Sequence, residues 1–284
     1  MPTRNVFDAS VRAALALLLA PVPSQAAPPA GYELVFGEEF DGAAVDFADR
    51  WDTHWVAWNI RHLAGNGDRA IKAADHERLR DAGATVGEML SAYLPDRDAY
   101  LHPIEDGVLR LQAWPVPADL RERFDGFPFV AGMLAGPRAH AQAYGYWETR
   151  LRIEALGTGQ HFALWLLPID GSWPPEIDML EAVGDDGLLR ANTHQSTRTM
   201  PISTFAPPDR IDAWLTIGFL WTTEEMVWTV DDAVVRREPA TIGAVAMYPL
   251  LTWEIGGKWP GPPDADTPWP GAVAIDYLRI YARR

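Results

Sequence analysis

The sequence of 284 residues contains no cysteine. This absence excludes disulfide bonds, thiolate metal sites, a cysteine nucleophile and a lipid-modified N-terminal cysteine. Basic residues are also scarce, because 24 Lys and Arg stand against 39 Asp and Glu, which gives a formal net charge of −15. Nucleic acids and anionic membrane surfaces bind clustered Lys and Arg, so we expect neither as a partner.

Long apolar runs are missing apart from one near the start of the chain. The run at residues 13–20 is too short to cross a bilayer, and Pro21 ends it. Small residues at Ser24 and Ala26 follow, and arginines precede the run. This order predicts a signal peptide over residues 1–26 and a secreted or periplasmic protein, in preference to an amphipathic or membrane-spanning helix. No G-x-S-x-G motif is present, so a Ser-His-Asp hydrolase has no support.

Short segments with alternating apolar and polar residues dominate the second half. In Y-W-E-T-R-L-R-I (residues 146–153), Trp147 and Leu151 share one face while Glu148 and Arg150 share the other. Similar runs, separated by Gly, Pro and Asp clusters, lie at residues 108–114, 161–167, 176–183, 214–221, 226–230, 250–255 and 272–281. Many short strands with few helical patterns predict an all-β sandwich or jelly roll, in one domain over residues 32–283.

Three acidic residues lie within six positions, at Glu176, Asp178 and Glu181. Side chains at i and i+2 of a strand share a face, so Glu176 and Asp178 point the same way. Glu181 falls on the other face of a regular strand, but one β-bulge at Met179 and Leu180 restores its phase. The spacing therefore predicts three carboxylates on one face. Two glutamates whose carboxyl groups lie about 5 Å apart are what glycoside hydrolysis with retention requires.

A cluster of acids usually forms a solvated strand face. Here a tryptophan and two prolines precede the cluster, and no Lys or Arg lies between Trp173 and Leu189. Burying carboxylates is costly unless they serve a purpose, so this context favours a catalytic cluster. The chain also contains 13 tryptophans, and exposed indoles stack on the flat faces of sugar rings. Together these features point to a carbohydrate.

S-W-P-P-E-I-D-M-L-E-A-V-G over residues 172–184 resembles the active-site strand of glycoside hydrolase family 16, in the bulged E-x-D-x-x-E form of its laminarinase-like branch. Other blocks resemble family segments and follow in the family's order. They are E-E-F-D-G (38–42) with Trp51, Y-G-Y-W-E-T-R-L-R-I (144–153), I-G-G-K-W-P-G (255–261) and I-D-Y-L-R-I-Y (275–281). The resemblance spans about residues 32–283, and the motif is a hypothesis that its strand context supports.

The resemblance implies a β-jelly-roll of two curved antiparallel sheets with a concave substrate cleft. Glu176 resembles the family's nucleophile, Glu181 its acid/base and Asp178 the carboxylate that assists the nucleophile. The implied reaction is double displacement, which needs no cofactor.

The resemblance also implies a set of sugar-binding residues around the acids. They are Trp173, Glu148, Arg150, Asn192, His194, His161 and Trp165. A cross-strand ion pair is the alternative for Glu148 and Arg150, and core packing is the alternative for Trp165 and Trp253.

Some positions depart from the family pattern. His161 stands where many relatives carry a cleft tryptophan, and Trp214 stands where a histidine is frequent. Residues 252–254 (T-W-E) replace an N-L-A-like stretch. Because such positions form subsites, the identity of the sugar is left open.

Many relatives bind a structural calcium ion. The matching ligands are Glu39, a backbone carbonyl near Gly107, and Asp276, and hard oxygen ligands suit calcium. Solvated acids at a sheet edge are the alternative.

The function that the sequence predicts is that of a monomeric, retaining, endo-acting hydrolase of a polysaccharide, acting on a β-1,3- or mixed-linkage β-glucan. The alternatives are a transglycosylase, a non-hydrolytic carbohydrate-binding protein on the same fold, and a depolymerase of another bacterial exopolysaccharide or galactan.

Overall fold

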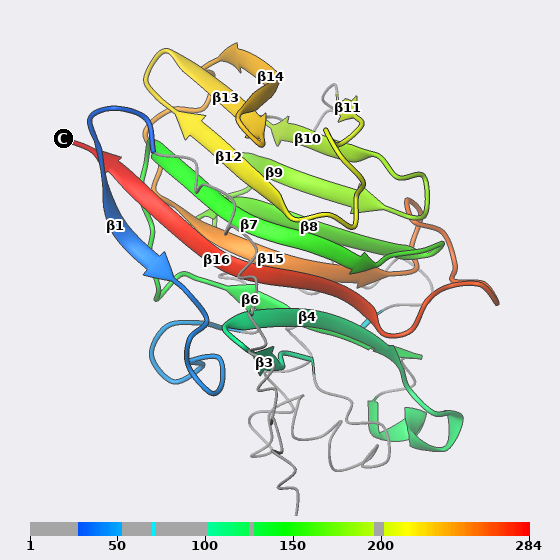
Figure 1. Cartoon of the computed structure of the whole chain (residues 1–284). Helices are drawn as coiled ribbons and strands as arrows, with labels where there is room; N and C mark the ends of the chain where they lie inside the picture. Colours follow the sequence, from blue (N-terminus) through cyan, green and yellow to red (C-terminus); the bar gives the residue numbers. More distant parts are fainter. Residues whose placement is uncertain (1–27, 53–69, 72–100, 125–127, 196–201) are drawn as a thin grey trace, which may run out of the picture.

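The computed structural model describes residues 28–52, 70–71, 101–124, 128–195 and 202–284. The predicted signal peptide at residues 1–26 lies outside the described residues. Figure 1 shows two curved sheets lying face to face, with β7 and β16 of one sheet in front of β8 and β15 of the other. In the described part of the chain, no helix has the length and apolar character that crossing a membrane requires.

The larger sheet has ten strands in the order β14-β13-β12-β7-β16-β4-β5-β2, with β1 also paired to β16 and β3 to β4. Its strands are β1 (Tyr32–Glu38), β2 (Ala70–Ile71), β3 (Ile104–Glu105), β4 (Val108–Pro115), β5 (Phe129–Ala131), β7 (Gly145–Ala155), β12 (Leu215–Trp221), β13 (Glu225–Val230), β14 (Ala233–Pro239) and β16 (Gly271–Arg283). All its pairings are antiparallel except β2 with β5.

The smaller sheet has six antiparallel strands in the order β11-β10-β9-β8-β15-β6. Its strands are β6 (Met133–Ala135), β8 (Gln160–Pro168), β9 (Glu176–Val183), β10 (Leu189–His194), β11 (Ser203–Phe205) and β15 (Met247–Ile255). A 3-10 helix, η3 (Ala118–Phe124), connects β4 to β5.

One apolar core fills the space between the sheets. Trp147 and Leu151 of β7 enter it from the larger sheet, and Phe162 and Leu164 of β8 enter it from the smaller one. The alternation predicted for residues 146–153 is therefore confirmed, because their apolar side chains share the core face. The predicted all-β sandwich is confirmed as well.

Strand β9 contains the predicted bulge. Leu180 pairs with Leu164 of β8, but the next pair joins Asp178 to Trp165, so Met179 is an extra residue. Met179 and Leu180 both enter the core and are at most 2% exposed. Two consecutive core-facing residues reverse the phase of the strand, so Glu181 returns to the face that carries Glu176 and Asp178.

Two buried indoles attach the sheets to each other by hydrogen bonds. Nε1 of Trp228, on β13, donates to the backbone carbonyl of Asp178 at 3.0 Å. Nε1 of Trp253, on β15, donates to the carbonyl of Leu111 on β4 at 2.9 Å. The first bond ends beside the bulge, whereas the second joins β15 to β4, neither of which pairs with β9.

Trp228→Phe and Trp253→Phe form a matched pair of variants. Each leaves a buried carbonyl without its donor, so each should lower the free energy of unfolding by about 1–3 kcal/mol, measured by denaturant titration. Only Trp228→Phe should also disturb the side chains of the acidic cluster, visible as chemical-shift changes at Glu176 and Glu181. Equal changes at these glutamates in both variants would show that Trp228 has no special role in holding β9.

Candidate active site

The face of the smaller sheet that points away from the core has an apolar part and an acidic part. The apolar part is a second buried cluster drawn from β6, β8 and β15. Its members are Met133, Ala135, Ala163, Trp165, Leu167, Tyr248 and Leu250. The acidic part lies on β9 between its neighbours β8 and β10, and it consists of Glu176, Asp178 and Glu181. We call this outer surface of the smaller sheet the site face.

Glu176 lies at the start of β9 and has two partners. Nε1 of Trp173 donates to its Oε2 at 2.8 Å, and Nε2 of His194 lies 3.2 Å from its Oε1. The Trp173 ring is 41% exposed, which leaves much of its surface open to a ligand. His194 comes from β10, where it pairs with Glu176 in register.

Asp178 is the most buried of the three acids, at 3% exposure. Nε2 of His194 lies 3.4 Å from its Oδ2, and the amide nitrogen of Asn192 lies 3.1 Å from the same Nε2. The structure therefore places Trp173, Asn192 and His194 around Glu176 and Asp178.

The pKa values of Glu176 and Asp178 both rise. Burial raises the pKa of Glu176 to about 8, with a further contribution from the charge of Asp178. Burial also raises the pKa of Asp178 well above its ordinary value, and the charge of Glu181 adds to this effect. Two carboxyl groups this close do not both ionise readily, so the pair retains a proton near neutral pH. The hydrogen bond from Trp173 opposes the rise in the pKa of Glu176, because it stabilises the ionised carboxylate.

Glu181 has a different partner. Nε2 of His161, on β8, lies 3.2 Å from its Oε1, and Nδ1 of the same ring lies 3.8 Å from Oε2 of Glu254 on β15. Burial alone would lower the pKa of His161, but the two carboxylates outweigh it and raise that pKa to about 9. The acids of β9 thus occupy two electrostatic environments, one with His194 and one with His161.

The prediction that Glu148 and Arg150 lie in the site is wrong. Strand β7 belongs to the larger sheet, and these side chains leave it on the face opposite the core. Glu148 accepts hydrogen bonds from the hydroxyls of Tyr146 and Tyr277. Arg150 pairs with Asp276 instead of Glu148, so the alternative of an ion pair between the two is wrong as well. Alternation shows which side chains share a face, but it does not show which sheet a strand joins.

The structure places Trp165 and Trp253 on opposite faces of the smaller sheet. Trp165 lies on the site face next to Asp178, is 8% exposed, and donates through Nε1 to Thr252 Oγ1 at 3.1 Å. Trp253 lies in the core. The site face also contains Glu254, from the stretch at residues 252–254 that was expected to form subsites. The exposed Trp259 was not assigned to the site, and its ring centroid is 4.9 Å from that of His161.

Two of the predicted calcium ligands, Glu39 and Asp276, are paired with arginines. Glu39 accepts two hydrogen bonds from Arg279, at 2.8 and 2.7 Å. Asp276 accepts one from Arg150 at 2.5 Å. Both carboxylates are thus neutralised by guanidinium groups, which leaves little net charge to attract calcium. Calcium binding stays a prediction from the resemblance.

Among the described residues, one group of three His, Asp or Glu side chains has ligand atoms close enough for a metal ion. It is Glu176, Asp178 and His194, with all ligand atoms within 4.8 Å of one another. The same closeness arises when a histidine lies between two carboxylates, as His194 does here, so we assign no ion to this group.

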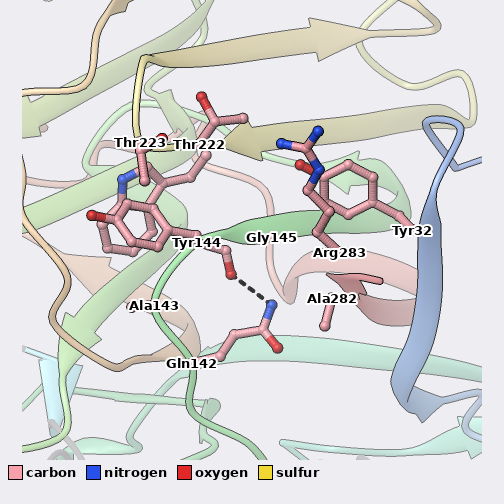
Figure 2. A pocket seen from close by; sticks show the side chains of 10 residues that line it. Tyr32, Gln142, Ala143, Tyr144, Gly145, Thr222, Thr223, Ala282 and Arg283 are labelled. Carbon is pink, nitrogen blue, oxygen red and sulfur yellow. Dashed lines mark hydrogen bonds between the residues drawn. The ribbon is translucent and has the colours of Figure 1, made fainter.

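A separate hollow of about 330 Å³ lies at the ends of β7, β12 and β16 (Figure 2). Tyr32, Tyr144 and Arg283 are among its lining residues, and Nε2 of Gln142 donates to the carbonyl of Tyr144 there. The hollow shares no residue with the acidic cluster and is not part of the site face.

Comparison with known proteins agrees with the geometry of β9. The sequence profile described as "Glycosyl hydrolases family 16" matches residues 132–279, which is just over half of the chain. The chain belongs to this family. The match includes β8, β9, β10 and β15, the strands that carry the acids and their partners.

Two curated relatives show how far the likeness extends. The endo-1,3-1,4-beta-glycanase EglC of Rhizobium meliloti (strain 1021) is 34% identical over 195 residues, 67% of this chain and 41% of that protein. The beta-glucanase of Rhodothermus marinus is 25% identical over 280 residues, 88% of this chain and 85% of that protein. The chain spans about two fifths of the length of the first relatives it matches.

Solved structures confirm the jelly-roll fold of this family 16 chain. The catalytic domain of a laminarinase from Thermotoga petrophila RKU-1 superposes with a TM-score of 0.69 at 20% identity, over 89% of this chain and 98% of that one. At this level of identity the likeness concerns the fold alone.

The shared proton of Glu176 and Asp178 gives a test that needs no substrate. Asp178→Asn removes the neighbouring carboxylate that raises the pKa of Glu176 and should lower that pKa by about one pH unit, whereas His194→Gln removes the imidazole that lowers it and should raise it. Carbon-13 NMR titration of the glutamate carboxyls measures both values. The exposed Asp186→Asn is the matched control and should leave Glu176 unchanged. A Glu176 pKa that is the same in Asp178→Asn as in the native chain would contradict the coupling.

Proposed function

We propose that the protein is a retaining, endo-acting hydrolase of a β-1,3- or mixed-linkage β-glucan. The observation that supports this most is the bulge in β9, which brings Glu176, Asp178 and Glu181 to one face beside the exposed indole of Trp173. Two glutamates flanking a bound sugar can supply a nucleophile and a proton donor from the same strand.

In the first half-reaction, the carboxylate of Glu176 attacks the anomeric carbon while the leaving oxygen takes a proton from Glu181. In the second, water attacks the glycosyl-enzyme ester and gives its proton to Glu181. Asp178 assists by holding the proton that Glu176 would otherwise carry. Trp173 is suited to stack on the sugar next to the bond that breaks, because its ring is exposed and its indole nitrogen is already bound to Glu176.

The choice of substrate rests on the names of relatives and on the site face. EglC is named as an endo-1,3-1,4-beta-glycanase and the Rhodothermus protein as a beta-glucanase. On the site face, the exposed side chains of Trp173 and Trp259 offer aromatic rings near the acids, the first at Glu176 and the second at His161, the partner of Glu181. We also propose that the protein is exported to the periplasm or the medium, because polysaccharides are met outside the cell. We propose that it acts there as a monomer.

Replacement of the two glutamates tests the reaction. Glu176→Gln and Glu181→Gln should each lower kcat by a factor of about 10³ or more on laminarin or lichenan, measured as new reducing ends. Glu148→Gln is the matched control, since it removes a buried carboxylate of the larger sheet, and it should keep native kcat at temperatures well below unfolding. Agarose, carrageenan and succinoglycan belong in the same assay. Cleavage of one of these alone would identify another exopolysaccharide or galactan, and binding without any cleavage would favour a carbohydrate-binding protein.

Rescue by azide assigns the two roles. With an activated aryl β-glycoside, azide should restore Glu176→Ala by direct attack and yield the α-glycosyl azide. It should restore Glu181→Ala through the glycosyl-enzyme and yield the β-azide. The reverse pattern of anomers would exchange the two assignments.

A further inference from the structure

Three ionisable side chains from three neighbouring strands form a continuous row on the site face. Glu181 of β9 lies 3.2 Å from Nε2 of His161 on β8, and Nδ1 of the same ring lies 3.8 Å from Glu254 on β15. Strand β8 lies between the other two, so the imidazole is held with one nitrogen toward each carboxylate.

The row leads from the buried acid to the surface. The side chains of Glu181 and His161 are 8% and 9% exposed, whereas that of Glu254 is 37% exposed. The exposed ring of Trp259 packs edge to face against His161 and limits its movement. A histidine that faces one carboxylate through each nitrogen can take a proton on one side and release a proton on the other, once a rotation of the exposed Glu254 side chain closes the 3.8 Å gap to Nδ1.

We propose that His161 is a positioning residue that shares one proton with Glu181 and connects that carboxylate to solvent through Glu254. This inference rests on the proposed function, in which Glu181 is the acid/base.

The proton balance of the two half-reactions is simple. The Glu181–His161 pair begins with one proton, which passes through Glu181 to the leaving oxygen as the glycosidic bond breaks. The pair then holds none, and water restores it when its oxygen attacks the anomeric carbon. Although burial alone would lower the pKa of His161, the two neighbouring carboxylates raise it to about 9, so the imidazole retains this proton until the pH approaches that value.

Three other charged side chains lie near the row of Glu181, His161 and Glu254. Asp178 lies on the same face of β9 and interacts with the charges of both Glu181 and His161. Arg190 of β10 pairs with Asp186 and has its guanidinium 5.9 Å from the centroid of the Trp259 ring. Arg236 of β14 lies behind the smaller sheet, where it donates to the carbonyl of Ala191.

The pH dependence of kcat/KM on a glucan tests this role. In His161→Gln the proton is held by Glu181 alone, so the basic limb should move to lower pH by more than one unit. The variant should then lose at least about tenfold more activity at pH 8 than at pH 5, relative to the native chain. Glu254→Gln should also move the basic limb of the pH profile to lower pH, but by a smaller amount than His161→Gln. His140→Gln, outside the site face, is the control and should leave the limb in place.

A second substrate separates proton supply from mere packing. A dinitrophenyl β-glycoside has a leaving group that needs little protonation, so the loss in His161→Gln should largely disappear with it. A uniform loss at every pH and with both substrates would mean that His161 only supports the fold, and would overturn the proposal while leaving the proposed function intact.

A measurement without substrate tests the shared proton of His161 and Glu181 independently of the proposed hydrolase activity. Nitrogen-15 NMR of the histidine rings should show His161 of the full chain titrating well above its ordinary value, and Glu254→Gln should lower that pKa. Titration of His161 near its ordinary value would overturn the shared proton, whether or not the protein cleaves any glucan. A protein that shows the raised value but cleaves no polysaccharide would instead count against the proposed function.

Discussion

The extra residue in β9 is the constraint on which the whole site depends. A strand alternates its side chains strictly, so Glu176 and Glu181 would lie on opposite sides of a regular β9. Met179 and Leu180 both turn into the core, and their burial makes the irregular register the favourable one. The fold thus stabilises the bulge through apolar packing on one side and presents three acids on the other.

Packing three carboxylates on one half-buried face costs free energy, and the surrounding residues show how that cost is reduced. Trp173 and His194 contact Glu176, while His161 contacts Glu181. Trp228 binds the backbone of Asp178 from the core side, which fixes the strand without using the carboxylate. These contacts divide one acidic row into two electrostatic environments. Such a division is what acid and nucleophile need when both are glutamates on one strand.

Local sequence was enough to predict features that depend on one strand. The spacing of the acids predicted the bulge at Met179 and Leu180, and alternation in residues 146–153 predicted which side chains enter the core. Features that depend on pairing between distant strands were not predictable in this way. Glu148 was assigned to the wrong surface because nothing in β7 shows that it joins the larger sheet. Glu254 was expected near a subsite but was not linked to His161, because only the pairing of β15 with β8 brings the two together.

Covalent trapping tests the central claim most directly. A 2-fluoro-substituted aryl β-laminaribioside forms a glycosyl-enzyme quickly and releases it slowly, so the adduct can be located by mass spectrometry of peptides. The bulged arrangement predicts a label on Glu176, in the peptide that contains β9. A label on Glu181, or on a carboxylate of the larger sheet such as Glu148, would contradict the account.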